Sequence, residues 1–409
     1  MSYKKEFLGD HIDILSGFAF KTKDFVDKGV PIIKIKNINP PCVTLDDLTY
    51  VSTEVAEKQR KFTLSYNDVL IAMTGSHINQ WASVVGRVAR VKYSDKTLLN
   101  QRVGKITIKD NTETDINYIY YFLSQDTVKI ELAVKAGGAA NQANISPAHI
   151  KGLSFPCPNL ETQRKIGNIL KAYDDLIENN QKQIKLLEEA AQRLYKEWFV
   201  DLRFPGYEHV KIVDGVPEGW YKQAIGDTFT TVLGGTPSRA NLSYWNGDIP
   251  WINSGEINSP RIVNESEFIT ELGLKKSSTK LMPKHTTVLA ITGATLGQVS
   301  YTEIETCANQ SVVGIIDDNQ FYSVYLYLYV SNNIWSMIGK ATGGAQQHIN
   351  KDIVNAYHIL LPSKDIIIKL NTIVEPMFSK MANLYVQNMR LAEARDRLLP
   401  KLMSGEIEV

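Results

Sequence analysis

Cysteine is scarce in this sequence, and the few cysteines stand far apart. Cys42, Cys157 and Cys307 are the only three among 409 residues, and none belongs to a Cys-x-x-Cys pair. Disulfide frameworks and structural zinc sites usually take even or closely spaced sets of cysteine and histidine residues. We therefore expect neither a disulfide framework nor a metal site, and a chain that works in the reducing cytoplasm.

Long apolar runs and an excess of one charge are lacking as well. No apolar run approaches the roughly 20 residues that span a bilayer, and the first residues alternate between charged and apolar types. The sequence therefore predicts a soluble, non-exported chain with no membrane contact. Since 45 Lys and Arg residues nearly balance 44 Asp and Glu residues, any DNA contact must come from local clusters of charge.

The short motifs of common catalytic sites are missing. No Gly-x-Gly, Gly-Lys-Ser/Thr, Asp/Glu-x-Lys or His-Glu-x-x-His occurs, which argues against dinucleotide binding, ATP-driven motor activity, a restriction-type nuclease and a zinc protease. The segment Asn39-Pro40-Pro41-Cys42 is similar to the loop with which amino-methyltransferases hold a flipped adenine, but Cys42 replaces the stacking aromatic residue. We interpret this segment as a proline-stiffened turn and predict a chain without catalytic residues.

An internal duplication organises the rest of the sequence. Five pairs of segments recur in the same order: 8–10 and 225–227, 30–33 and 249–252, 69–75 and 288–293, 100–101 and 309–310, and 137–139 and 343–345. Short β-branched runs predict strands at 32–35, 69–73, 84–88 and 249–252, and helical patterns occupy 116–123 and 324–330. We therefore expect two mixed α/β domains, 1–158 and 206–362, each followed by a helical segment, 159–205 and 363–409.

The two helical segments are expected to contain a break. Pro376 aligns with Ala172, and proline disrupts the interior of a helix. This predicts short helices at 160–171 and 364–374, followed by long helices at 174–203 and 376–403. Asp174 would then cap the first long helix.

Both long helices carry a coiled-coil seam at alternating three- and four-residue spacing. The seam residues are Ile177, Asn180, Ile184, Leu187, Ala191, Leu194 and Trp198 in the first helix, and Met381, Leu384, Asn388, Leu391, Arg395, Leu398 and Leu402 in the second. Such helices can lie on their own domains or pair with each other; we favour antiparallel pairing, because two equivalent seams can satisfy each other. The expected fold class is α/β, with two similar mixed α/β domains separated by a pair of long antiparallel helices, a coiled coil, in a pseudo-twofold arrangement.

The order of these parts resembles the specificity subunits of Type I restriction-modification enzymes. The resemblance covers essentially the whole chain and is carried by segments 7–10 and 224–227, 249–252, the Thr-Gly strand ends, the Asn-Gln pairs, and the domain ends at 156–166 and 360–362. It implies two target-recognition domains, each reading one half of an interrupted DNA sequence, and paired helices that act as a ruler and dock two methyltransferase (modification) subunits. It also implies that S-adenosylmethionine and ATP are bound by partners, the modification and restriction/translocase subunits, and not by this chain.

Candidate contacts with double-stranded DNA are polar side chains for base edges and cations for phosphates. They are Lys34, Lys36, Asn37, Thr74, Ser76, Arg87, Arg90, Arg102, Asn141 and Gln142 in the first domain, and Asn253, Thr292, Gln298, Gln346, Gln347 and His348 in the second. For each of them a merely solvated surface role stays equally open. Segments that differ between the copies, such as 346–348, are expected to read different bases.

Two other functions stay open from the sequence. One is the recognition part of a fused restriction-methylation enzyme with a cryptic activity, against which the missing cofactor loops argue. The other is a coiled-coil interaction scaffold unrelated to DNA, which would fail to retain a specific duplex.

Overall fold

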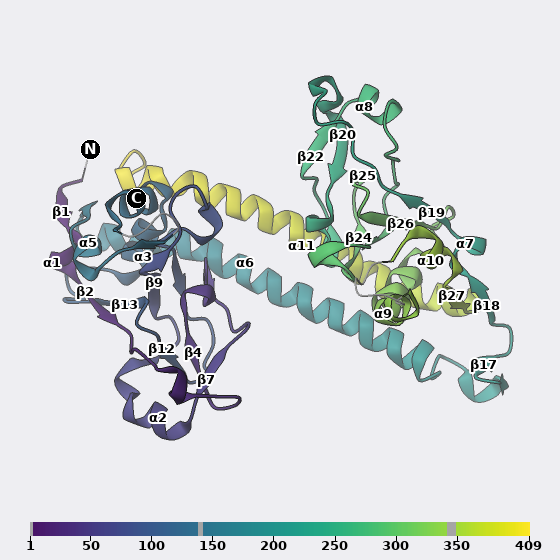
Figure 1. Ribbon diagram of the computed structural model, residues 1–409, viewed down its shortest axis with the longest axis horizontal. Coiled ribbons are helices and arrows are strands. Elements are labelled where there is room, and N and C mark those ends of the chain that lie inside the picture. The colour runs from purple at the N-terminus through teal and green to yellow at the C-terminus, as the bar shows by residue number, and fades with distance from the viewer. Residues whose placement is uncertain (1–2, 138–141, 342–348) are drawn as a thin grey trace. The chain divides into compact units, whose positions relative to one another are not determined.

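The computed structural model describes residues 3–137, 142–341 and 349–409 (Figure 1). The chain folds into two compact units. Unit 1 joins the chain up to Leu176 with Leu391–Val409, and unit 2 is Ile177–Arg390. Each unit contains one of the two sequence copies as a mixed α/β body, so the predicted duplication and fold class are confirmed.

Two larger sheets form the globular part of unit 1. The six-stranded sheet has the order β2 (Ile12–Ser16), β13 (Val103–Ile108), β9 (Val69–Ala72), β11 (Val88–Arg90), β6 (Cys42–Val43) and β5 (Ile38–Asn39). The five-stranded sheet has the order β3 (Phe25–Val26), β7 (Thr49–Val51), β4 (Val30–Ile33), β12 (Thr97–Leu99) and β8 (Thr63–Leu64). All four residues of β9 are buried, as expected for an aliphatic run at the centre of a sheet.

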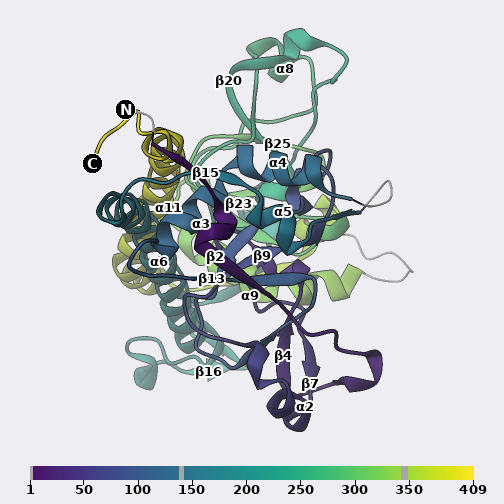
Figure 2. The ribbon, with the colours of Figure 1, turned by 90° about the vertical axis from the view of Figure 1, so that its left-hand side faces the viewer.

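Short helices pack against the two sheets of unit 1. They are α1 (Leu8–His11), α2 (Thr53–Lys58), α3 (Ile116–Ser124), α4 (Asp126–Lys135) and α5 (Pro147–Lys151). Helix α3 begins where Asp115 accepts a hydrogen bond from the Tyr118 backbone N–H at 3.0 Å. In this unit α3 contacts β11 and α5 contacts β2, beside the sheet (Figure 2).

Unit 2 repeats this architecture. Its five-stranded sheet has the order β19 (Thr230–Leu233), β26 (Val312–Ile316), β23 (Thr287–Ala290), β24 (Val299–Thr302) and β21 (Arg261–Ile262), and its three-stranded sheet β22 (Glu267–Ile269), β20 (Trp245–Ile252) and β25 (Cys307–Ala308). Besides the long helices it contains α7 (Ile225–Thr228), α8 (Glu271–Lys275), α9 (Ser323–Ala341) and α10 (Lys351–Ala356). Strand β9 lies between β13 and β11 just as β23 lies between β26 and β24.

The first and last strands of each copy pair with each other. Strand β1 (Lys5–Phe7) is antiparallel to β15 (Ser154–Pro156), and β18 (Tyr221–Ala224) is antiparallel to β27 (His358–Leu361). Two-stranded pairs also form between β10 (Thr74–Gly75) and β14 (Ala143–Asn144), and between β16 (Ile212–Val213) and β17 (Val216–Pro217). The start of each domain is therefore tied to its end before the long helix follows.

Several predicted local elements need correction. The strand predicted at 84–88 begins only at Val88, because Gly86 adopts a left-handed φ of +83° that interrupts an extended chain. The helix predicted at 324–330 extends over the whole of α9. Residues 39–42 form the turn between the antiparallel strands β5 and β6. This agrees with the prediction of a proline-stiffened turn.

The predicted break in the two helical segments is wrong. Helix α6 runs without interruption from Leu160 to Tyr195, and α11 from Lys364 to Ser404. Pro376 lies inside α11 on its exposed face, where water can bind the carbonyl group that loses its N–H partner. Asp174 is not a cap: it lies inside α6, where it accepts a hydrogen bond from the Tyr121 hydroxyl at 2.6 Å.

The two long helices pair in antiparallel sense within each unit, as predicted (Figure 1). In unit 1 the guanidinium of Arg395 lies 2.6 Å from the Asp174 carboxylate. In unit 2 the Asn180 amide donates to Asn388 at 2.9 Å and to Gln387 at 3.0 Å. The seam therefore carries polar pairs that fix its register.

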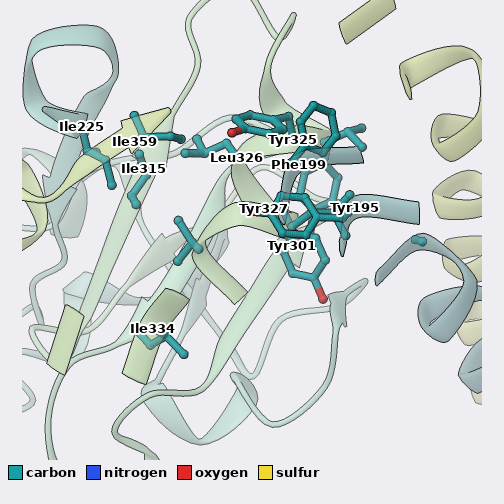
Figure 3. Packing of buried hydrophobic residues seen from close by; sticks show 14 of the residues in the cluster. Tyr195, Phe199, Ile225, Tyr301, Ile315, Tyr325, Leu326, Tyr327, Ile334 and Ile359 are labelled. Carbon is teal, nitrogen blue, oxygen red and sulfur yellow. The ribbon is translucent and has the colours of Figure 1, made fainter. Parts of the chain in front are cut away.

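The seam of unit 2 also packs on the globular part of that unit, so both arrangements considered from the sequence occur together. Ile184, Met381 and Leu384 belong to one buried cluster with the core of the second copy. In the same cluster the ring centre of Phe199 lies 4.8 Å from that of Tyr325, and Figure 3 shows Tyr195 close to this pair. The helical tail of the first copy is thus built into the core of unit 2.

None of the helices in the described part of the chain combines the length and the apolar character that crossing a bilayer requires.

Candidate nucleic-acid interface

In unit 1 three segments that hold predicted DNA contacts meet at one end of the six-stranded sheet. The Met73 N–H donates to the Arg102 carbonyl, and the Ile145 N–H donates to the Met73 carbonyl, both at 2.9 Å. Beside them the Thr74 hydroxyl donates to the Asn144 side chain at 2.8 Å. Arg102 and Gln142 are exposed at this end, which we call recognition end 1 (residues 73–83, 100–102 and 142–145).

The loop after Gly75 presents an aromatic ring that the sequence reasoning missed. Trp81 is 40% exposed and Ile78 is 52% exposed. The ammonium of Lys129 lies 4.9 Å from the centre of the Trp81 ring. An exposed indole beside a cation can contact a base or sugar while the cation binds a phosphate. The only sequence signal was an aromatic residue in a loop rich in Ser, Asn and Gln.

Two residues predicted to contact DNA, Ser76 and Arg87, form hydrogen bonds to the backbone of this loop instead of pointing into solvent. The Ser76 hydroxyl donates to the Gln80 carbonyl at 2.6 Å and shares a hydrogen bond of 2.9 Å with Ser83. The guanidinium of Arg87 donates to the Ala82 carbonyl at 2.9 Å. Burial also lowers the pKa of Arg87. Since Ser76 and Arg87 both donate to backbone carbonyl groups of the loop, we assign them a role in positioning the loop.

The remaining candidates of the first copy are engaged within unit 1, and Lys34 follows Ile33, whose carbonyl accepts the Asn100 N–H of recognition end 1 at 3.1 Å. Lys34 donates to Thr49 at 2.8 Å, Lys36 pairs with Asp47, and Asn37 is buried within the turn that follows β4. Burial, followed by the nearby Lys36 charge, lowers the pKa of Lys34. Arg90 is 5% exposed, and its guanidinium lies 4.1 Å from the ring centre of Tyr120.

Unit 2 builds an equivalent end, recognition end 2 (residues 291–298, 309–311 and 349). The Ile291 N–H donates to the Ser311 carbonyl at 2.9 Å, and the Ile349 N–H donates to the Ile291 carbonyl at 3.2 Å. Thr292 and Gln298 are half-buried here, and Trp335 is 66% exposed. Asn253 lies next to this end, because the Asn309 N–H donates to the Ile252 carbonyl at 3.0 Å, and the Asn253 side chain accepts the Gly255 N–H at 2.7 Å in a turn. Four candidates lie outside the described residues: Asn141, Gln346, Gln347 and His348.

One arginine of β21 joins the five-stranded sheet of unit 2 to both long helices of that unit. The side chain of Arg261 is fully buried, and its guanidinium lies 3.4 Å from Glu188 of α6 and 3.6 Å from Glu303. It also lies 3.6 Å from the ring centre of Phe378 in α11. Burial raises the pKa of Glu303, and the Arg261 charge opposes that rise. The sequence reasoning missed Arg261 because its partners are distant along the chain.

Comparison with known proteins also detects the two copies of the duplicated unit. The sequence model of the family described as Type I restriction modification DNA specificity domain matches residues 2–189 and 217–375. The chain is 29% identical over 335 residues to the Type I restriction enzyme MjaIX specificity subunit of Methanocaldococcus jannaschii, covering 80% of this chain and 76% of the relative. It is 28% identical over 350 residues to the HindI specificity subunit of Haemophilus influenzae, covering 70% and 76%.

The fold also matches a solved structure. The crystal structure of a Type I restriction-modification system S subunit from M. genitalium superposes with a TM-score of 0.61 at 17% identity, covering 98% of this chain and 96% of the other. The two sequence copies, their equivalent recognition ends and the paired family matches agree with one another. The chain therefore belongs to the Type I restriction modification DNA specificity family.

Proposed function

We propose that this chain is the DNA-reading specificity subunit of a Type I restriction-modification enzyme. The observation that carries the proposal is the repeated recognition end. The same backbone hydrogen bonds around Met73 and Ile291 support loops of different sequence in the two copies. Equivalent scaffolds with different loops suit two domains that read different halves of an interrupted target.

Each recognition end combines two kinds of contact. At recognition end 1, Arg102 and Gln142 are exposed and can donate to base edges, where guanidinium and amide groups distinguish guanine and adenine. Lys129, which pairs with Asp126 at 2.6 Å and lies beside Trp81, is proposed to bind a phosphate. At recognition end 2, Thr292 and Gln298 offer the polar groups and Trp335 the exposed ring.

The long helices are proposed to hold the two reading domains at a set spacing. Helix α6 has 36 residues, which corresponds to about 54 Å at a rise of about 1.5 Å per residue. Arg261 joins both helices to unit 2, and in unit 1 the Tyr121 hydroxyl of α3 donates to Asp174 of α6, which in turn pairs with Arg395 of α11. Rigid anchoring at each end is what a ruler needs.

The partners follow from this role. Exposed apolar side chains on the long helices, Leu186 of α6 and Ile368 of α11 among them, are proposed to bind two modification subunits. These subunits would bind S-adenosylmethionine, the restriction subunits would bind ATP, and this chain would supply no catalytic residue. The assembly would act on genomic DNA in the cytoplasm.

The test is a reconstituted complex of this chain with its modification subunits, assayed by sequencing the methylated DNA. We expect one interrupted target. Trp81→Ala should weaken methylation of that target by about tenfold or more, because stacking on a base contributes about 1–3 kcal/mol. Tyr66→Ala is the control, since Tyr66 is also exposed, at 53%, but lies outside both recognition ends.

A second measurement addresses the ruler. Inserting one helical turn, about 5.4 Å, into both α6 and α11 should lengthen the unread gap and leave both half-sites unchanged. Altered half-sites would contradict the ruler. Binding of S-adenosylmethionine by the purified chain alone would favour a fused enzyme's recognition part, and failure of the assembled complex to retain any specific duplex would favour a scaffold unrelated to DNA.

A further inference from the structure

Three side chains that commonly bind metal ions meet in unit 1, and the DNA-reading role uses none of them. Glu6 belongs to β1, His11 ends α1, and Cys157 follows β15. His11 Nε2 lies 2.7 Å from Glu6 Oε2 and 3.9 Å from Cys157 Sγ. Ligand atoms of all three residues lie within 4.8 Å of one another.

These separations are close to those of a tetrahedral zinc site. Zinc binds nitrogen and oxygen at about 2.0–2.2 Å and sulfur at about 2.3 Å, which places ligand atoms about 3.3–3.8 Å apart. The His11–Cys157 separation of 3.9 Å already fits. The His11–Glu6 pair would open by about 0.6 Å, which a small rotation of the half-buried Glu6 side chain supplies.

Neighbouring groups hold the ligands in place. His11 Nδ1 shares a buried hydrogen bond of 2.7 Å with the Thr114 hydroxyl, which turns Nε2 toward Glu6 and Cys157. A second partner that orients the imidazole in this way is usual at zinc sites. The fully buried Gln163 amide donates to the Pro158 carbonyl at 2.9 Å and fixes the chain beside Cys157.

The exposed Lys4 occupies the other Glu6 oxygen at 2.7 Å. This shows that a positive charge is already favourable beside the carboxylate. The flexible, solvent-facing lysine can move aside without loss of a buried contact. A metal held by these three side chains would complete its four-coordinate shell with water.

The second copy shows that the fold itself does not need these three side chains. There β18 pairs with β27 as β1 pairs with β15, with Gln223 at the position of Glu6. Thr228 ends α7 where His11 ends α1, and Leu361 follows at the place of Cys157. The same strand pairing forms without any of the three ligands, so in the first copy the ligand set is additional to what the fold requires.

We propose that Glu6, His11 and Cys157 bind one zinc ion in the first copy. The Glu6 carboxylate, His11 Nε2 and the Cys157 thiolate donate to the metal, a water fills the fourth position, and the thiol proton is released to solvent. The ion ties the first strand of the domain to the segment that leads into α6. The cysteine spacing gave no such indication, because Cys157 and His11 are 146 residues apart.

The test uses the full chain, stripped of metal with a chelator and titrated with Co²⁺ and then Zn²⁺. We expect one equivalent of Co²⁺ with a thiolate-to-cobalt charge-transfer band, displaced by Zn²⁺, and a higher unfolding temperature in the presence of Zn²⁺. Cys157→Ser should remove the band, and Glu6→Gln, which installs the residue of the second copy, should weaken Zn²⁺ binding by at least about tenfold. Cys42→Ser is the control and should leave the band unchanged.

Two results would overturn the proposal. One is a native chain that binds no Co²⁺ with a charge-transfer band. The other is a band that survives in Cys157→Ser or disappears in Cys42→Ser. Since Glu6→Gln leaves every cysteine in place and alters a partly exposed side chain, it separates metal binding from loss of folding, which circular dichroism checks for each variant.

Discussion

Replacing Arg261 with methionine should destabilise unit 2 far more than the equivalent change of Arg90 destabilises unit 1. The Arg261 guanidinium is buried between Glu188, Glu303 and the Phe378 ring. Methionine keeps an apolar contact with the ring but leaves two carboxylates, 16% and 15% exposed, without their cation. Breaking a buried pair by removing one partner costs about 3–5 kcal/mol.

Arg90 supplies a matched control. It is also buried, and it lies 4.1 Å from the ring centre of Tyr120. In the described residues no carboxylate lies within ion-pair distance of it. Arg90→Met therefore loses mainly a cation–π contact of about 1–2 kcal/mol.

Urea unfolding followed by tryptophan fluorescence measures the difference. Of the six tryptophans only Trp81 lies in unit 1, so the signal reports chiefly on unit 2, and circular dichroism follows both units. We expect Arg261→Met to lower the free energy of unfolding of unit 2 by about 3 kcal/mol. Equal costs for the two substitutions would refute the role assigned to the carboxylates.

The loss should also depend on pH. Burial raises the pKa of Glu303, and Arg261 holds that rise back. Without Arg261 the pKa of Glu303 rises further. Unit 2 is then stable at low pH, where Glu303 is neutral, and loses this stability as the pH rises through the folded-state pKa and the buried carboxyl group ionises. Arg261→Met should therefore cost less at pH 5 than at pH 8, and a cost independent of pH would contradict this account.

Three further outcomes are expected. Asn180→Ala removes the donor to Gln387 and Asn388 and should lower the free energy of unfolding of unit 2 by about 1–3 kcal/mol in the fluorescence assay; no loss would show that the polar pair is dispensable. Pro376→Ala should raise that free energy by about 1–3 kcal/mol, because it restores a helix hydrogen bond, and unchanged stability would speak against the cost assigned to this proline. Trp335→Ala should weaken methylation by about tenfold through the half-site read by unit 2 alone, which sequencing of targets with single half-site changes resolves; an equal effect on the other half-site would contradict the assignment of recognition end 2.

Features that repeat or follow a local period could be predicted from the order of the amino acids. The paired segments from Leu8 to Gly138 and from Ile225 to Gly344 revealed the duplication, and the seam from Ile177 to Trp198 predicted a helix pair. Both rest on spacing along the chain, which the sequence displays directly. The resemblance to Type I specificity subunits rested on the order of these motifs and is confirmed by the family matches.

The candidate site was predicted only in outline. Thr74, Arg102 and Gln142 come together at recognition end 1, but the sequence could not distinguish them from Asn37 and Arg90, which the fold buries. A polar residue after a strand looks the same in the sequence whether it faces solvent or a neighbouring turn. Whether these residues contact DNA stays a prediction.

Tertiary structure alone decided the rest, because packing energy outweighs local preference and acts between distant residues. Helix α11 continues through Pro376 since buried neighbours such as Val374 and Phe378 hold it on unit 2. The end of α6 enters the core of the second copy through contacts of Phe199 with Tyr325, and His11 meets Cys157 across the first domain. No local pattern encodes such contacts, since each depends on how segments far apart in the sequence fold against each other.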